Sequence, residues 1–311
     1  MTKKPLISII TPSLNRADMI ATAIESVFNQ DYPYIEHIIM DGGSMDGTLD
    51  VVKRYSHLEI ISEPDQGLYD AINKGIQLAR GEIIGLLNTD DCYEPNVFSQ
   101  LAECFQRHPE AFAVCGGSSY FVDQDQREDT ILRLPPITQD DLPERLTIGI
   151  PAINSFFFRK AAFDTIGYFD LGYRLASDRD FLLKFACAGL SLVSFSEDVY
   201  RYRSHPGSLT IYNVWKPLLL DELLRLAAVY SQPNIKAPIR IACLKWENVY
   251  TLDVIGHFIR RRDFRSAFQY FFRTSRRHWW WPIYFMFSFP LKVVRYLRGN
   301  KSVLLSKSIS G

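Results

Sequence analysis

Short apolar runs alternate with amphipathic segments along the first half of the chain. Four runs rich in β-branched residues predict buried strands, at residues 6–11, 34–40, 58–62 and 83–87. The segments between them place apolar side chains at helical spacing, as at Ile20, Ile24 and Val27. Strands that alternate with helices form parallel sheets covered on both faces. The pattern therefore predicts an α/β fold with a mostly parallel, Rossmann-like sheet flanked by helices.

The pattern changes twice further along the chain. Three more strands are predicted, separated by less regular helices, at residues 112–121, 154–159 and 192–202. A helix begins near Ser177, and we expect Ser177 to cap it and Asp180 to complete a capping box. From Trp215 onward the periodicity is only helical. We therefore expect a sheet-based domain at residues 1–210 and a helical C-terminal region at 211–311.

Asn88, Thr89, Asp90 and Asp91 follow the fourth predicted strand directly. Adjacent carboxylates resist ionisation because each charge raises the pKa of its neighbour. A hard divalent cation such as Mg²⁺ or Mn²⁺ removes this repulsion and commonly bridges carboxylates to substrate phosphates. The same residue types also favour exposed turns. The stretch is therefore either a metal–pyrophosphate site or a plain turn.

Polar residues also follow the other three strands of the predicted sheet. Pro12 and Ser13 end the first strand, Asp41 and Gly42 end the second, and residues 63–65 end the third. Ligands of open α/β sheets bind at the carboxyl ends of the strands, so these loops should converge on one crevice. No Gly-x-Gly-x-x-Gly follows the first strand and no Gly-x-x-x-x-Gly-Lys-Ser/Thr occurs, which argues against a dinucleotide cofactor and a P-loop NTPase.

Two further polar residues are candidates for chemistry. Asp178 lies in the first turn of the helix at Ser177, where the helix dipole favours a carboxylate. It is either a general base or an ordinary helix-end charge. His205 follows Arg201 and Arg203 just before a Pro-Gly-Ser turn. A cationic pair with an imidazole can clamp a pyrophosphate or complete a metal shell, whereas a lone histidine in a turn is more often a plain surface residue.

Composition and charge add two constraints. Hydrophobic residues make up 47% of the 311 residues and the net charge is zero, so the chain can bury a large core and is no general polyanion binder. The charge is unevenly spread, because residues 257–301 hold eleven Lys or Arg and one acid, Asp263. Such a segment indicates a basic surface-binding tail. The five cysteines are scattered without a CxxC pair, which fits a reducing cytosol and predicts neither a zinc site nor a disulfide framework.

Residues 6–210 resemble the family 2 glycosyltransferases, which have the GT-A fold. The matching motifs are ISIITPSLN at 7–15, IMDGGSMDGT at 39–48, EPDQGLYDAINKG at 63–75, GEIIGLLNTDD at 81–91, GYFD at 167–170 and SDRD at 177–180. Their order and spacing both fit, over roughly two thirds of the chain. The resemblance implies a nucleotide-sugar donor, with a UDP-sugar expected. The residues that it places around the nucleotide are Thr11, Pro12, Asn15, Asp41, Asp65 and Lys74, with Asp41 on the base or ribose.

The resemblance also assigns the 88–91 stretch to the DxD motif of the family, with Asn88 in place of the first carboxylate. Asp90 would then serve the sugar or ribose–phosphate side, and Asp91 would be the favoured ligand of Mg²⁺ or Mn²⁺. Which of these two carboxylates binds the metal directly stays open. His205 falls on a polar position near the diphosphate and is a further candidate metal ligand.

By the same resemblance Asp178 is the catalytic base. It would take the proton of an acceptor hydroxyl as that oxygen attacks the anomeric carbon, and a single displacement inverts the configuration. The metal would neutralise the leaving nucleoside diphosphate. The expected enzyme is thus an inverting, metal-dependent hexosyltransferase. The alternatives are a sugar nucleotidyltransferase, although no Gly-rich basic activating loop is present, and a non-catalytic nucleotide-sugar-binding scaffold.

The basic tail lies outside the resemblance. Phe264, Phe268, Phe271 and Phe272 are predicted to share one helical face, and Trp279 opens an apolar run that prolines interrupt. This run is shorter than the roughly 20 residues that a membrane-spanning helix needs. Arginines among Trp and Phe suit a membrane interface, whereas the alternatives are packing on the catalytic domain or a dimer contact. Grooves for single-stranded nucleic acid have a similar composition, but the acidic remainder of the chain argues against one.

We therefore expect a peripheral contact with the cytoplasmic face of the cell membrane and no nucleic-acid partner. Membrane attachment would suit an acceptor that is a glycan or a polyprenyl-diphosphate-linked saccharide of bacterial cell-surface polysaccharide assembly. This expectation rests on the resemblance together with the tail.

Overall fold

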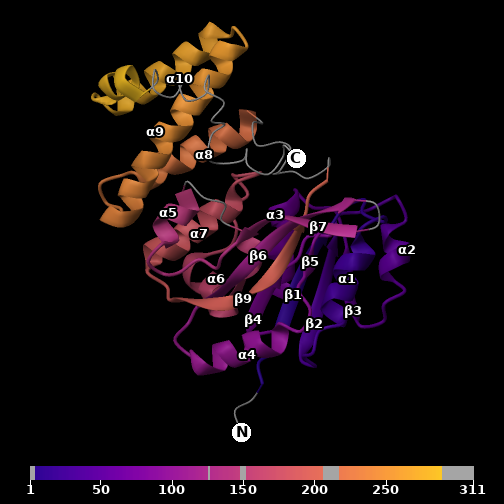
Figure 1. Cartoon of the computed structure of the whole chain (residues 1–311). Helices are drawn as coiled ribbons and strands as arrows, with labels where there is room; N and C mark the ends of the chain where they lie inside the picture. The colour runs from indigo at the N-terminus through magenta and orange to yellow at the C-terminus, as the bar shows by residue number, and fades with distance from the viewer. Residues whose placement is uncertain (1–3, 125–126, 148–151, 206–216, 289–311) are drawn as a thin grey trace. The chain divides into compact units, whose positions relative to one another are not determined.

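The computed structural model describes residues 4–124, 127–147, 152–205 and 217–288 (Figure 1). These residues divide into two compact units, one of residues 4–146 and 152–205 and the other of residues 217–288 with Thr147. The domain boundary that the sequence predicts, at residue 210, lies outside the described residues.

One nine-stranded sheet forms the centre of the first unit (Figure 1). Its N-terminal strands are β1 (Ile7–Ser13), β2 (Ile35–Asp41), β3 (Leu58–Ser62) and β4 (Ile83–Leu86). They pair in parallel in the order β3-β2-β1-β4, and Ile9 of β1 lies between His37 and Gly85. The four strands predicted for this half are thus confirmed to within two residues at each end.

The second half of the sheet mixes strand directions. β8 (Phe156–Arg159) runs antiparallel to β4 and to β6 (Ala113–Gln124), and β9 (Leu192–Arg203) runs parallel to β6. Two strands that the pattern did not predict, β5 (Cys92–Tyr93) and β7 (Arg127–Leu134), pair antiparallel with β9 and β6. The predicted α/β fold is confirmed, and parallel pairing is confined to β1–β4 and the β6–β9 pair.

One face of the sheet is covered by α1 (Ile20–Phe28), α2 (Thr48–Val52) and α4 (Phe98–Arg107). Ile9 of β1 and Phe157 of β8 pack in a single buried cluster with Ala23 of α1 and Phe98 of α4. Side chains of a strand alternate between faces, so Ile10 and Phe158 point the other way. Both sets are apolar because helices cover both faces.

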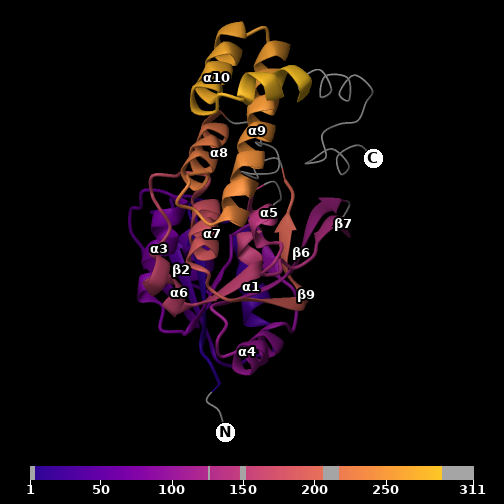
Figure 2. The same ribbon diagram turned by 90° about the vertical axis from the view of Figure 1, so that its left-hand side faces the viewer.

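The opposite face is covered by α3 (Leu68–Leu78), α6 (Lys160–Ile166) and α7 (Ser177–Ala188) (Figure 2). Phe158 of β8 packs edge-to-face on Phe163 of α6 and Phe181 of α7. The backbone of α3 approaches β1 so closely that a Cβ at Gly75 would lie 2.4 Å from Cγ2 of Ile10. Only glycine fits this approach. A short helix, α5 (Leu142–Thr147), follows β7.

The start of α7 differs from the prediction. Ala176 is the N-cap residue and no side-chain cap is made, so the expected capping role of Ser177 is wrong. Ser177 is already the first helical residue and is fully buried. Asp180 ion-pairs with Lys184 one turn later, at 2.6 Å, instead of closing a capping box. Asp180 is therefore structural, as expected, but through a different contact.

The second unit is helical, as its sequence predicts. It comprises α8 (Pro217–Tyr230), α9 (Ala237–Arg260), α10 (Phe264–Arg277) and a further helical stretch at 281–288 (orange to yellow in Figure 1). Asp263 caps α10 by accepting a hydrogen bond from the Ser266 amide at 3.0 Å. Leu252, Ile255, Ala267 and Trp281 form a buried cluster between α9, α10 and the last stretch. Among the described residues no helix combines the length and apolarity that crossing a bilayer requires.

Candidate active site

Hydrogen bonds to Tyr200, a buried tyrosine of β9, hold the turn after β4 in place. The Tyr200 hydroxyl donates to Oδ2 of Asp91 at 2.9 Å and accepts from the Asn88 amide at 3.1 Å and from Nδ2 of Asn154 at 3.0 Å. One donated and two accepted bonds use the full capacity of a phenol. The turn at 88–91 therefore has a fixed shape before any ligand arrives.

Asp91 points into this network and is buried. Besides the Tyr200 hydroxyl, its carboxylate accepts from Nδ2 of Asn88 at 3.0 Å and from the Arg203 amide at 2.8 Å. Burial raises the pKa of Asp91 to about 8, and the Asp90 charge adds to that rise, while the three donors partly offset it. The most engaged carboxylate of the motif thus has little capacity left for a ligand.

Asp90 is the more accessible carboxylate of the pair. Its Oδ2 lies 2.9 Å from Nε2 of His205, and the two side chains are 21% and 18% exposed. Nε of Arg203 donates to the Asp90 carbonyl at 3.0 Å, which fixes the backbone behind the carboxylate. The structure thus brings together Asp90 and His205, which are 115 residues apart in the chain.

The pair is a partial match to a divalent-cation site. Octahedral ligands about 2.1 Å from a metal lie about 3 Å apart when adjacent, close to the observed Asp90–His205 spacing. Within the described ranges, no group of three or more His, Cys, Asp or Glu residues has the arrangement of a cation site. A cation held here would therefore need further oxygen ligands from substrate phosphates and water, as is usual for Mg²⁺.

Asp178 and Asp91 both influence a stacked pair of tyrosines. Tyr120 of β6 and Tyr202 of β9 stack at 4.7 Å between ring centres, with an interplanar angle of 15°. Burial raises the pKa of both phenols, and the charges of Asp91 and Asp178 add to the rise in each. The carboxylates of Asp91 and Asp178 thus both disfavour ionisation of this tyrosine pair.

Burial also raises the pKa of Asp178 itself above the usual aspartate value, although the Arg179 charge partly offsets this. Such a carboxylate is a stronger base than a solvated one. Its position depends on α3, because Tyr69 stacks on Phe169 at 5.5 Å and the Asn73 amide bonds both backbone groups of Phe169, at 2.8 and 3.0 Å. These contacts fix the loop that leads into α7.

Asp41 orders the loop at the end of β2. Its carboxylate accepts from the amides of Gly43 and Ser44, at 3.1 and 3.0 Å, and from the hydroxyls of Ser44 and Ser62. These four bonds match the roughly four acceptor positions of a carboxylate. Asn15, in the left-handed region at φ 52°, receives the Met45 amide on its side-chain oxygen at 2.9 Å. Both residues thus shape one loop edge beside β1.

Asp65 lies directly against that loop. A Cβ on Gly42 would come within 2.5 Å of Oδ2 of Asp65, so any larger residue at position 42 would displace this carboxylate. The other oxygen of Asp65 accepts from the Gly67 amide at 2.7 Å. Lys74 of α3 contacts Glu63 at 2.9 Å and the Pro64 carbonyl at 3.1 Å, and so holds the strand end next to Asp65.

Thr11 and Pro12 are buried within the sheet. Oγ1 of Thr11 lies 2.9 Å from Nε2 of the buried His37 on the neighbouring strand. Burial lowers the pKa of His37 to about 3, so this imidazole is neutral. The Thr11 side chain is thereby engaged inside the fold, whereas Asn15 lies exposed at the loop edge.

Sequence reasoning overlooked the tyrosines. Tyr200 and Tyr202 alternate along β9 and therefore share one face, and Tyr120 pairs with Tyr202 from β6. The alternation of Tyr200 and Tyr202 can be recognised in the sequence. The pairing of β6 with β9, which brings Tyr120 to them, cannot. Arg201, one of the two arginines considered for a pyrophosphate clamp, ion-pairs with Glu94 and Glu128.

Comparison with known sequences identifies a family. The sequence model of the family described as Glycosyl transferase family 2 matches residues 8–167. A PGL/p-HBAD biosynthesis glycosyltransferase of Mycobacterium tuberculosis is 31% identical over 189 residues, which cover 58% of this chain and 69% of that protein. A putative teichuronic acid biosynthesis glycosyltransferase, TuaG of Bacillus subtilis, is 31% identical over 151 residues, which cover 47% of this chain and 60% of that protein.

Solved structures share the fold. TarS of S. aureus (residues 1–349), in complex with UDP, superposes with a TM-score of 0.57 at 18% identity and covers 81% of this chain and 72% of that chain. The mannosyltransferase PcManGT of Pyrobaculum calidifontis, in complex with GDP-Man and Mn²⁺, superposes with a TM-score of 0.60 at 18% identity and covers 89% of this chain and 76% of that chain.

Proposed function

This chain belongs to glycosyl transferase family 2 and has the GT-A fold, and from that premise we propose that it moves a sugar from a UDP-sugar to a hydroxyl of a glycan acceptor. The observation that carries the proposal is the Asp90–His205 pair at the turn after β4, next to the buried Asp91, whose charge, like that of Asp178, acts on the Tyr120–Tyr202 pair. Relatives named for PGL/p-HBAD and teichuronic acid biosynthesis support a role in cell-surface polysaccharide assembly. The UDP complex of TarS supports the donor class.

On the donor side, we assign direct nucleotide contact to Asp65 and Asn15, at the loop edge. Lys74 supports Asp65 through the 63–64 strand end, while Asp41 orders the loop beneath. Thr11 and Pro12 form the buried floor of this pocket. Asp41 thus acts on the base or ribose through the loop that its four hydrogen bonds hold.

Mg²⁺ or Mn²⁺ fits the Asp90–His205 pair, and the Mn²⁺ in the PcManGT structure supports this choice. When bound, such an ion neutralises charge on a leaving nucleoside diphosphate. We assign the direct contact to Asp90 and His205. Asp91, expected to be the favoured ligand, instead holds the turn together with Asn88 and Tyr200. The greater exposure of Asp90 and the three hydrogen bonds that Asp91 accepts support this assignment.

Asp178 is our candidate general base. Its raised pKa gives it the proton affinity to take a hydrogen from an acceptor hydroxyl, which then attacks the anomeric carbon as the nucleoside diphosphate leaves. A single displacement inverts the anomeric configuration, and no second carboxylate is required as a nucleophile. Asn88, Tyr200 and Arg203 keep the neighbouring turn in place during this step.

The acceptor that we propose is a glycan or a polyprenyl-diphosphate-linked saccharide. A lipid-linked acceptor lies at a membrane, so transfer would take place on the cytoplasmic face of the cell membrane with the enzyme peripherally attached. The basic and aromatic residues of the second unit support this location.

The test measures nucleoside diphosphate release from UDP-, GDP- and dTDP-sugars with Mg²⁺ or Mn²⁺, with and without acceptor glycan. Wild-type protein should release UDP and form a product of inverted configuration. The Asp178→Asn variant should bind donor normally but transfer about 10²–10⁴-fold more slowly. Asp90→Asn should lose cation-dependent donor binding more severely than Asp91→Asn loses it.

Three outcomes would contradict the proposal. Release of pyrophosphate would indicate a nucleotidyltransferase, and donor binding without any release would indicate a scaffold. Transfer by Asp178→Asn at the wild-type rate would remove Asp178 from the mechanism. Asp180→Asn in the same helix is the matched control, because Asp180 is committed to Lys184 and should affect stability rather than turnover.

A further inference from the structure

We propose that α10 presents a face that lies flat on a lipid bilayer rich in anionic headgroups. This outer face consists of Phe264, Phe268 and Phe272, with arginines beside it. The inference rests on the proposed membrane-located acceptor and adds the surface, its orientation and the lipid chemistry. It divides the aromatic residues of the tail into those that build the fold and those left exposed.

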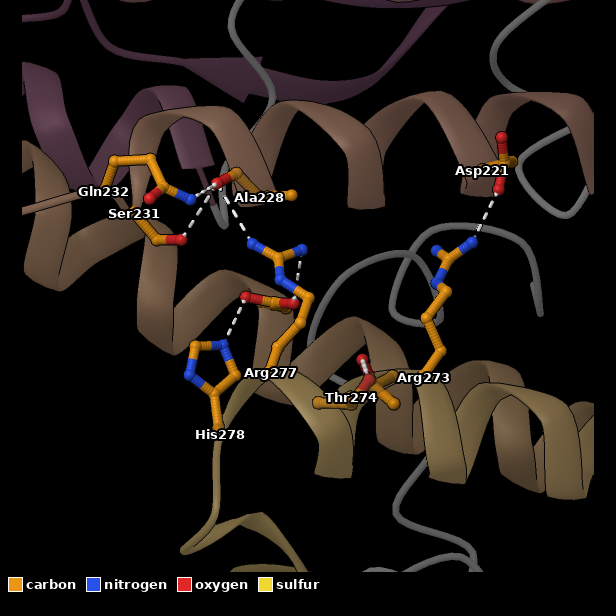
Figure 3. Close-up of polar contacts among 10 residues, drawn as sticks. Asp221, Ala228, Ser231, Gln232, Arg273, Thr274, Arg277 and His278 are labelled. Atoms are coloured by element: carbon orange, nitrogen blue, oxygen red, sulfur yellow. Dashed lines mark hydrogen bonds and ion pairs between the residues drawn. The ribbon is translucent and has the colours of Figure 1, made fainter.

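The orientation of α10 within the second unit is fixed by polar contacts (Figure 3). Arg277 and His278 both reach the buried Glu247 of α9, at 3.1 and 3.0 Å. Arg273 reaches Asp221 of α8 at 3.0 Å. Breaking a buried ion pair is costly because it leaves an uncompensated charge. The helix therefore cannot readily rotate to bury a different face.

Aromatic packing fixes the same orientation. Phe271 points inward and meets Trp281 at 5.4 Å and Phe285 at 5.0 Å between ring centres. Trp281 is fully buried. Phe271 thus differs in burial from the other three phenylalanines, although all four follow the spacing expected for one side of the helix. Trp281 belongs to the core of this unit, and the partly buried Phe271 packs against it.

The outer face remains uncovered within the described part of the chain. Phe264, Phe268 and Phe272 are 63%, 64% and 41% exposed. They are spaced four residues apart, which aligns them along one side of the helix. Further exposed apolar side chains continue beyond α10, at Trp279, Ile283, Met286 and Phe287. Phe268 and Phe272 lie against each other, with ring centres 4.3 Å apart, and exposed apolar side chains that cluster in this way mark interaction sites in soluble proteins.

The charge of α10 selects the partner. The helix carries Arg265, Arg273, Arg276 and Arg277 and no acidic residue. A hollow of about 590 Å³ opens between its phenylalanines and arginines, lined by Phe268, Gln269, Phe272, Arg273, Arg276 and Arg277. Apolar side chains next to guanidinium groups match the boundary between acyl chains and phosphate headgroups.

Two other occupants fit less well. A second copy of this chain docked through the same face would bring arginine-bearing helices together, and like charges in an interface are repulsive. A spanning arrangement is ruled out by length, because α10 has 14 residues and a bilayer needs about 20. An anionic lipid surface satisfies both the apolar and the basic side chains.

The experiment is vesicle co-sedimentation of the full chain, with phosphatidylcholine alone and with added phosphatidylglycerol. Wild-type protein should bind the anionic vesicles. The double variant Phe268→Gln/Phe272→Gln should bind at least tenfold more weakly. The double variant Arg265→Gln/Arg276→Gln should bind anionic vesicles about fivefold more weakly for each arginine removed, and it should no longer prefer anionic over neutral lipid. Arg273 and Arg277 stay unchanged because they hold the fold.

The matched control is Val229→Gln/Ile241→Gln, which removes exposed apolar side chains from α8 and α9 and should bind like wild type. Circular dichroism should show unchanged helix content in every variant. Equal binding by the phenylalanine variant, equal binding to neutral vesicles, or loss of self-association in place of vesicle binding would each overturn the inference. Sugar transfer to a soluble acceptor without vesicles, unchanged in all these variants, tests the proposed function separately.

Discussion

Replacing Tyr200 by phenylalanine removes a single oxygen atom from beneath the candidate active site. The ring keeps its contacts, including the edge-to-face packing on Tyr93 at 5.3 Å. The hydroxyl takes three hydrogen bonds with it, to Asp91, Asn88 and Asn154. The substitution therefore isolates the polar support of the 88–91 turn from the packing of the core.

The cost follows from what is left buried. Two neutral donors lose their acceptor, which costs about 1 kcal/mol each, and at a pH above the Asp91 pKa of about 8 the buried carboxylate loses a donor, which costs about 1.5–3 kcal/mol. The three bonds share one oxygen, so their sum of roughly 4 kcal/mol is an upper limit. We expect the free energy of unfolding to fall by about 3 kcal/mol. The loosened turn should also weaken UDP-sugar binding, because Asp90 belongs to it.

Tyr93→Phe is the matched control. Tyr93 is equally buried in the same cluster, but its hydroxyl makes one bond, to the Leu86 carbonyl at 2.9 Å. Its loss should cost about 1 kcal/mol. Urea unfolding followed by circular dichroism measures both variants. All five tryptophans lie at or beyond Trp215, so their fluorescence follows the C-terminal region alone. Equal destabilisation by the two substitutions would refute the reasoning, as would unchanged donor affinity in Tyr200→Phe.

Three further predictions follow from local geometry. His37 is neutral in the fold with a pKa of about 3, so its contribution to stability is present above the unfolded pKa of about 6.5 and is lost as pH falls. Urea unfolding should show that the free energy of unfolding falls by about 2 kcal/mol between pH 7 and 5, and His37→Gln should abolish this fall. An unchanged pH dependence in the variant would contradict this. Gly42→Ala should displace Asp65 and weaken donor binding, measured by calorimetry, about tenfold. In an Asp65→Ala background the same substitution should have little further effect. If the two substitutions weaken donor binding additively, the contact does not matter for binding. Arg262 lies in the left-handed region at φ 59°, so Arg262→Gly should raise the free energy of unfolding by about 0.5–1 kcal/mol. Arg261→Gly, at φ −82°, should give no such increase in thermal melting. An increase at both positions would show that the left-handed conformation is not the cause.

The candidate site was predictable to the extent that its residues follow strands. Asp41, Asp65 and the 88–91 stretch all end predicted strands, and the rule for open α/β sheets places such ends at one edge. The relation of Asp91 to Tyr200 was not predictable, because the two are separated by 109 positions and meet through β5 and β9, one of them a two-residue strand. Local periodicity carries no information about such pairing.

The C-terminal region shows the same division. Its helical periodicity and its basic, aromatic composition are properties of the chain, and α8, α9 and α10 form where they are expected. The tertiary contacts of α10 distinguish its aromatics: Arg277 and His278 pair with the buried Glu247, Phe271 packs partly buried against Trp281, and Phe268 stays exposed.

The sequence by itself determined the strands, the helices and the polar strand ends, because each depends on residues that are neighbours in the chain. Only the tertiary structure decided which carboxylate is enclosed and which is open. Asp90 and Asp91 are adjacent and chemically identical, but their environments come from β9, where Tyr200 and the Arg203 amide engage one and His205, just beyond the strand, meets the other. Burial and hydrogen bonding, rather than residue type, distinguish the two carboxylates.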